Sequence, residues 1–209
     1  MLRYRLALIL LSLPLLLYTA WIAIRERNPR YFRERLGFTG SALRGGVWIH
    51  AASVGEVNAV MPLIQLLAER RPDLPISLSC NTPGGALVAR KQLPPRAGLH
   101  FLPIDWHWAT GHFLRGLSPR CALIMETELW PNLYTHCDRL NIPLIIINGR
   151  LSPRTMRANA WLRDLYRDCM SGCRAILTRS EQDSGRFIEL GAEPDRVTQS
   201  IAPKSRNPL

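Results

Sequence analysis

Short apolar runs of strand length alternate with amphipathic segments over residues 45–200. Regular alternation of this kind predicts a parallel sheet with helices on both faces, an α/β Rossmann-like domain. The expected strands are Val47–Ala51, Ile76–Cys80, Leu99–Pro103, Cys121–Met125, Pro143–Asn148, Arg174–Thr178 and Arg196–Gln199. The expected helices are Val57–Arg70, Pro83–Gln92, Trp106–Leu114, Leu129–Leu140, Pro153–Met170 and Glu181–Leu190.

In parallel sheets of this kind, ligands bind beyond the carboxyl ends of the strands. Ser53 and Glu56 follow the first strand with the spacing of a capping box, in which the two side chains satisfy amides at a helix start. Glu56 is also placed to act as a general base in the cleft, and Gly55 leaves room for a substrate beside the backbone. The sequence keeps both interpretations open.

Three other strand ends carry polar groups. Residues 81–85, Asn-Thr-Pro-Gly-Gly, fit either a simple helix start or an anion-binding helix N-terminus. Residues 126–132, Glu-Thr-Glu-Leu-Trp-Pro-Asn, bring two carboxylates to the predicted cleft, where solvated loop charges are the alternative. Arg150, Arg154 and Arg157 have the spacing of one helical face, either solvated or facing a phosphorylated acceptor or acidic lipid headgroups.

Residues 1–36 form a separate segment. The run from Leu6 to Ile24 has no charged residue, and as a helix it would be about 28 Å long, close to the thickness of the hydrocarbon core. Pro14 would kink it. Arginines follow it closely, so we expect a membrane anchor with the protein body on the cytoplasmic side, either spanning the bilayer or lying in its interface.

Composition narrows the remaining function classes. The net charge is +11, carried almost entirely by arginine, which favours an anionic partner. The five cysteines have irregular spacing, which indicates free thiols rather than a disulfide framework. The histidines lack the usual spacing of zinc ligands, so we expect no metal site. Neither a dinucleotide fingerprint nor a P-loop is present, and nothing resembles a nucleic-acid-binding motif.

Three segments together resemble one enzyme family. They are residues 48–56 (Trp-Ile-His-Ala-Ala-Ser-Val-Gly-Glu), residues 125–132 (Met-Glu-Thr-Glu-Leu-Trp-Pro-Asn) and residues 148–152 (Asn-Gly-Arg-Leu-Ser). They are similar to the 3-deoxy-D-manno-octulosonic acid (Kdo) transferases of lipid A assembly. The seven residues from Glu126 to Asn132 are the most specific part, and the N-terminal segment with its arginines fits as well.

The resemblance implies the N-terminal, acceptor-binding half of a two-domain GT-B glycosyltransferase. Such enzymes transfer Kdo from CMP-Kdo to a lipid A precursor (lipid IVA) in lipopolysaccharide core biosynthesis, with inversion and without an obligatory metal or other cofactor. They work at the cytoplasmic side of the bacterial inner membrane. By this likeness Glu56 is the proton acceptor, and Glu126 stabilises the transition state. The expected substrate-binding residues are Ser53, Gly55, Thr82, Glu128, Arg150 and Arg154.

The likeness weakens near the end of the chain. Lys204 falls where the family has a lysine facing the leaving nucleotide, but its neighbours differ from the family pattern. The sequence stops at Leu209, where the CMP-Kdo domain of such enzymes would begin. We therefore expect that domain to be absent and the chain alone to have negligible transferase activity. The alternatives are a membrane-associated GT-B enzyme with another nucleotide sugar, and a non-catalytic module that binds anionic lipid.

Overall fold

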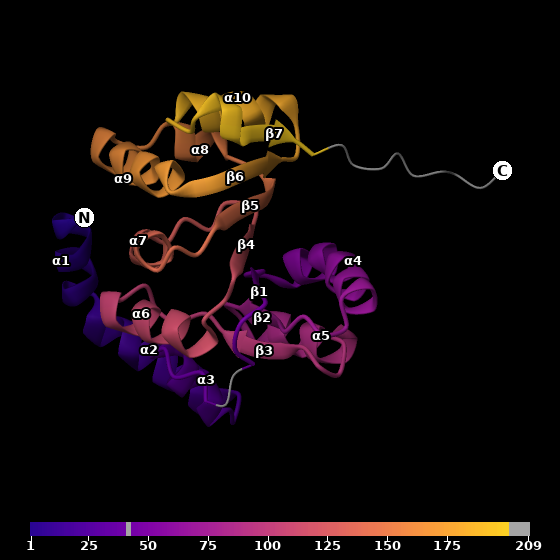
Figure 1. The fold of residues 1–209 in the computed structure, drawn as a ribbon. Coiled ribbons are helices and arrows are strands. Elements are labelled where there is room, and N and C mark those ends of the chain that lie inside the picture. Colours follow the sequence, from indigo (N-terminus) through magenta and orange to yellow (C-terminus); the bar gives the residue numbers. More distant parts are fainter. Residues whose placement is uncertain (41–42, 201–209) are drawn as a thin grey trace.

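The computed structural model describes residues 1–40 and 43–200 (Figure 1). The strands are β1 (Val47–His50), β2 (Ile76–Cys80), β3 (Gly98–Phe101), β4 (Cys121–Met125), β5 (Leu144–Gly149), β6 (Cys173–Thr178) and β7 (Val197–Gln199). The helices are α1 (Leu2–Leu10), α2 (Ser12–Arg25), α3 (Pro29–Arg35), α4 (Val54–Arg70), α5 (Pro83–Gln92), α6 (His107–Leu117), α7 (Pro131–Arg139), α8 (Pro153–Met156), α9 (Ala160–Ser171) and α10 (Glu181–Glu189). A short 3₁₀ turn, Pro194–Arg196, precedes β7.

The strands form a single parallel sheet in the order β3-β2-β1-β4-β5-β6-β7. Figure 1 shows α4 and α5 on one side of the sheet and α6 and α7 on the other. The sequence prediction of a Rossmann-like α/β domain is confirmed. Strand order reverses between β1 and β4, and this switch point is where ligands bind in sheets of this type.

Apolar burial on both faces explains why the strands read as nearly continuous aliphatic runs. Trp48 and Ile124 are fully buried in a core that also takes in Phe113 of α6 and Leu133 of α7. A second core lies on the other face, where Ile49 and Leu78 pack against Val57, Val60 and Ile64 of α4. The central strands β1 and β4 are thereby held rigidly beneath the switch point.

The expected long helix over residues 153–170 is wrong. The chain forms α8, leaves helical geometry at Arg157, and restarts as α9 at Ala160. Ser152 caps the first helix by accepting a hydrogen bond from the Thr155 amide at 3.1 Å, and Asn159 caps the second by accepting from the Leu162 amide at 2.9 Å. Because two good N-cap side chains compete for one stretch of chain, the segment splits in two.

The N-terminal segment forms two helices, α1 and α2, instead of the single kinked helix that the sequence predicts. The chain bends by 55° between α1 and α2. Pro14 has no amide to donate to the carbonyl of Leu10, so the helical ladder is interrupted at this level. No single helix among residues 1–40 and 43–200 is long and apolar enough to cross a bilayer, although α1 and α2 taken together have the required length and composition.

The bent helix pair is docked on the Rossmann-like domain. Leu8, Leu15 and Leu16 pack against a cluster that includes Ile104 and Trp106. Two polar contacts fix α1 beside α7. Tyr4 donates to the Asp105 carboxylate at 2.8 Å, and Arg5 donates to the side chain of Asn132 at 3.0 Å. The opposite side of the pair leaves large apolar side chains exposed, among them Leu2, Leu10, Leu13 and Ile24.

Candidate functional site

Loops from three neighbouring strands surround a cleft of about 550 Å³ at the switch point. Glu56 enters it from the first turn of α4, residues 126–130 from the end of β4, and Arg150 from the end of β5. Ser152, Thr155 and Tyr166 complete the wall. Parallel pairing brings these strand ends together, as expected for ligand sites in such sheets.

Glu56 has a clear structural role. The Ser53 hydroxyl accepts a hydrogen bond from the Glu56 amide at 3.3 Å and donates to its Oε1 atom at 2.8 Å. The Oε2 atom accepts from the Ala52 amide at 2.9 Å. Ser53 is therefore confirmed as the cap of α4, and Glu56 forms a variant of the capping box in which its carboxylate accepts from the Ala52 amide instead of the Ser53 amide. Each carboxylate oxygen has more than one lone pair, so Glu56 remains able to accept a further hydrogen bond from a ligand in the cleft.

Glu126 has an unusual backbone. Its φ angle is +55°, in the left-handed region, while its amide still continues the ladder by donating to the Ile147 carbonyl at 2.9 Å. A glutamate in this conformation costs of order 1–3 kcal/mol, and such strain concentrates at functional sites. Asn148 at the end of β5 has a φ of +53°, which asparagine tolerates well.

Glu128 is held by its neighbours. Its Oε2 atom accepts hydrogen bonds from Asn81 Nδ2 at 3.2 Å and from Trp130 Nε1 at 3.0 Å. His50 Nε2 lies 3.8 Å from the same oxygen, and the other ring nitrogen contacts Ser79 Oγ at 2.9 Å. Glu128 is thus fixed at the rim of the cleft by groups from three strand ends.

Three of these partners were not predicted as site residues. His50 is fully buried at the end of β1, and within the described chain its Nε2 atom has no hydrogen-bond partner. Trp130 and Asn81 lay within motifs that the sequence singled out, but no role could be assigned to them. Tyr166 reaches the cleft from the middle of α9, and no local sequence signal marks it.

The remaining predicted residues have varied positions. Arg150 precedes the Ser152 cap and lies outside any helix, so the expected helical face of Arg150, Arg154 and Arg157 does not form. Arg154 is not among the residues that line the cleft, and Thr82 instead caps α5 and lines a separate pocket. Lys204 lies outside the described residues.

The described residues contain no group of three or more His, Cys, Asp or Glu side chains arranged to hold a metal ion. All five thiols are free. The cleft brings together three carboxylates, those of Glu56, Glu126 and Glu128, and the guanidinium of Arg150. Such a set can accept a proton, stabilise positive charge and bind an anion.

Comparison with solved structures gives the fold that the chain shares with known proteins. The UDP-N-acetylglucosamine 2-epimerases from Neisseria meningitidis and Methanocaldococcus jannaschii each align with a TM-score of 0.53, at 10% and 11% sequence identity. The alignments cover 74% and 75% of this chain and 46% of each epimerase. The chain thus has the Rossmann-like α/β fold of one half of a GT-B protein.

Sequence comparison then gives the family. The family model described as 3-deoxy-D-manno-octulosonic-acid transferase (kdotransferase) matches residues 30–205. The chain belongs to this family. It is 34% identical to a 3-deoxy-D-manno-octulosonic acid transferase from Bordetella pertussis over 76% of its length, and 32% identical to one from Haemophilus influenzae over 91%. It spans only 38% and 46% of these two relatives.

Proposed function

We propose that the chain is the acceptor-side part of an inverting glycosyltransferase that moves Kdo from CMP-Kdo to a hydroxyl of a lipid A precursor (lipid IVA). Family membership supports the Kdo transferase assignment. The observation that carries the mechanism is the presence of Glu56, Glu126 and Arg150 in one cleft at the switch point.

Glu56 serves as the general base in this proposal. A sugar hydroxyl is a weak nucleophile and needs a positioned acceptor for its proton as it attacks the anomeric carbon. As the new carbon–oxygen bond forms, the proton passes to Glu56 and the bond to the CMP phosphate breaks. The capping contacts with Ser53 and Ala52 hold the carboxylate in one orientation, so little reorganisation is needed at the moment of transfer.

Glu126 and Arg150 stabilise the charges that develop on the substrates during transfer. Glycosyl transfer builds positive charge on the sugar ring, which a fixed carboxylate stabilises. Glu126 has no side-chain hydrogen bond within the described chain, so its carboxylate is available to the sugar, whereas Glu128 is occupied by Asn81 and Trp130. Arg150 is the cation of the cleft wall and is suited to an anionic group of either substrate.

Attachment to the cytoplasmic face of the bacterial inner membrane is part of the proposal. One side of the α1–α2 pair packs on the domain through Leu8 and Leu15, and the other exposes large apolar side chains. The contacts of Tyr4 and Arg5 with the domain would have to break for α1 to leave it. These features favour a helix pair lying in the membrane interface over one that spans the bilayer.

The test joins this chain to the C-terminal remainder of one of its relatives and expresses the fusion in a bacterial strain that lacks Kdo transferase. Rescue of growth, together with Kdo transfer from CMP-Kdo by the purified fusion, would support the proposal. A folded, membrane-bound fusion that uses UDP-N-acetylglucosamine but not CMP-Kdo would point to another nucleotide sugar. A fusion that binds lipid but transfers neither sugar would leave an anionic-lipid-binding module.

A further inference from the structure

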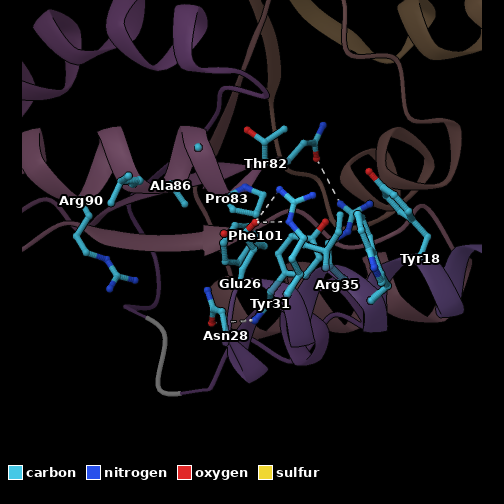
Figure 2. Close-up of a pocket in the computed structure, with 16 residues that line it drawn as sticks. Tyr18, Glu26, Asn28, Tyr31, Arg35, Thr82, Pro83, Ala86, Arg90 and Phe101 are labelled. Atoms are coloured by element: carbon cyan, nitrogen blue, oxygen red, sulfur yellow. Dashed lines mark hydrogen bonds and ion pairs between the residues drawn. The ribbon is translucent and has the colours of Figure 1, made fainter.

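A second pocket of about 660 Å³ lies between the N-terminal helices and α5, apart from the cleft. Figure 2 shows Tyr18 and Arg35 on the helical side and Thr82 and Pro83 on the side of α5. The walls combine three arginines, Arg25, Arg35 and Arg90, with the aromatic side chains of Tyr18, Trp21, Tyr31 and Phe101. The transfer reaction proposed for the cleft gives this pocket no role.

Arg35 is a partly buried cation with no carboxylate partner in the part of the chain that the structure describes. Its Nη1 atom donates to the Leu102 carbonyl at 2.6 Å and to Asn81 Oδ1 at 3.4 Å, but in residues 1–40 and 43–200 its buried Nε atom has no partner and no salt bridge reaches it. Burial lowers the pKa of Arg35, and Tyr31 and Tyr18 oppose that effect. A desolvated guanidinium of this kind gains most from an anion that enters the pocket.

The N-terminal turn of α5 adds to the positive potential beside Arg35. Thr82 and Gly84 line the pocket, and Thr82 caps the helix by accepting from the Gly85 amide at 3.1 Å. The positive end of the helix dipole therefore lies at the same wall as the guanidinium. Glu26, the acidic residue in the wall, is already paired with Arg25 at 3.1 Å, so it does not neutralise Arg35.

We propose that this pocket binds the phosphate monoester of an amphipathic ligand, with Arg35 as its principal contact. A phosphate monoester carries nearly two charges at neutral pH and three acceptor oxygens, which suit a guanidinium beside a helix N-terminus. The aromatic and apolar walls, including Leu87, leave room for the part of the ligand that carries the phosphate. This site does not depend on which sugar the cleft transfers.

One residue links the pocket with the cleft. Asn81 accepts from Arg35 with Oδ1 and donates to Glu128 with Nδ2. A phosphate that draws Arg35 toward itself would weaken the first contact and free Asn81 to shift. The indole of Trp130, which shares the same Glu128 oxygen, is then a reporter for the pocket on the cleft side.

The test measures binding to the 209-residue chain by calorimetry at constant ionic strength. The probes are inorganic phosphate, and vesicles of phosphatidylcholine with or without phosphatidic acid. Arg35→Gln should weaken binding about tenfold to a hundredfold, as expected for loss of a charge-assisted contact. Arg120→Gln removes the same charge at an exposed position outside the pocket and should change affinity by less than about twofold.

A second pair of variants tests the pocket without changing Arg35, in case Arg35→Gln does not fold. Leu87 lines the pocket with 59% of its surface exposed, and Leu66 on α4 is 44% exposed outside it. Leu87→Glu should repel phosphate, and Leu66→Glu should not. If Arg35→Gln or Leu87→Glu weakens the binding of inorganic phosphate, the pocket is a site for a soluble phosphate. If the two variants weaken only the binding of vesicles that contain phosphatidic acid, the pocket is a site for a lipid headgroup. No binding in either arm, or equal losses in test and control variants, would overturn the proposal.

Discussion

Glu56→Gln separates the two roles of the residue that the structure places both in a helix cap and in the cleft. Glutamine is also found at the third position of capping boxes, because its amide oxygen accepts a hydrogen bond as a carboxylate does. The variant can keep one of the two contacts, with the Ala52 amide or the Ser53 hydroxyl, and it loses the other. It also loses the negative charge near the positive end of α4.

These losses are small in the free energy of unfolding. One exposed capping contact and one favourable interaction with the helix dipole together contribute about 1 kcal/mol. For a chain of this size such a change lowers Tm by about 2–4 °C. The folded state should therefore survive, while loss of a general base should reduce transfer by about 10²- to 10⁴-fold.

The assay compares four proteins in the two-domain fusion described above. Thermal unfolding and Kdo transfer are measured for the wild type, Glu56→Gln, Ser53→Ala and Glu69→Gln. Ser53→Ala removes the capping hydroxyl and keeps the carboxylate, so it should lower Tm by a similar amount and retain transfer within about tenfold. Glu69→Gln makes the same charge change at the far, exposed end of α4 and should alter neither property.

Two results would refute the assignment of Glu56. If Glu56→Gln transfers Kdo at the wild-type rate, the residue is a helix cap alone. If Ser53→Ala loses transfer as completely as Glu56→Gln while both remain folded, the geometry of the cap, rather than proton acceptance, explains the loss.

Three further predictions concern the fold. Burial raises the pKa of Asp105 from 3.8 to about 6, although its hydrogen bonds oppose this effect. The folded state then holds the proton more tightly than the unfolded state, so the free energy of unfolding should fall by about 3 kcal/mol as the pH rises from 4 to 6. Denaturation curves of Asp105→Asn should lack this pH-dependent component. Cys121 is the least buried thiol, whereas burial raises the pKa of Cys137 to about 12; a thiol reagent should label Cys121 first in the native chain and Cys137 only on unfolding. Asn159→Ala should destabilise the chain by about 1 kcal/mol in chemical denaturation, because α9 loses its cap; no change would contradict that role.

The central strands could be predicted because they are largely buried on both faces and so read as mostly apolar runs bounded by polar or proline residues. Helix boundaries were harder, since they depend on which of several capping side chains forms its contact. α4 begins at Val54 because Ser53 is used as the cap, and residues 153–171 divide because Ser152 and Asn159 are both used. Both outcomes depend on local hydrogen bonds that periodicity does not reveal.

The position of the N-terminal helices on the domain could not be predicted from the sequence, for a different reason. A run from Leu6 to Ile24 without charge is equally suited to lipid and to a protein surface. In the structure two polar contacts hold α1 on the domain: Tyr4 donates to the buried Asp105, and Arg5 donates to Asn132, each more than a hundred residues away in the sequence. Pairings over that separation have no local signal, so sequence alone could not choose between them.

The two carboxylates that follow β4 show how much of the site the motif contained. Spacing placed Glu126 and Glu128 together at a strand end but could not distinguish them, because residues two apart in an extended chain point to the same face. The left-handed turn at Glu126 breaks this symmetry. Past that turn Glu128 meets Asn81 and Trp130, which occupy one of its oxygens, while no described side chain contacts the carboxylate of Glu126 by a hydrogen bond. The strained backbone at Glu126 thus accompanies a difference between the two side chains: Glu128 is held in the wall of the cleft, whereas the carboxylate of Glu126 is the one that the proposed mechanism assigns to the substrate.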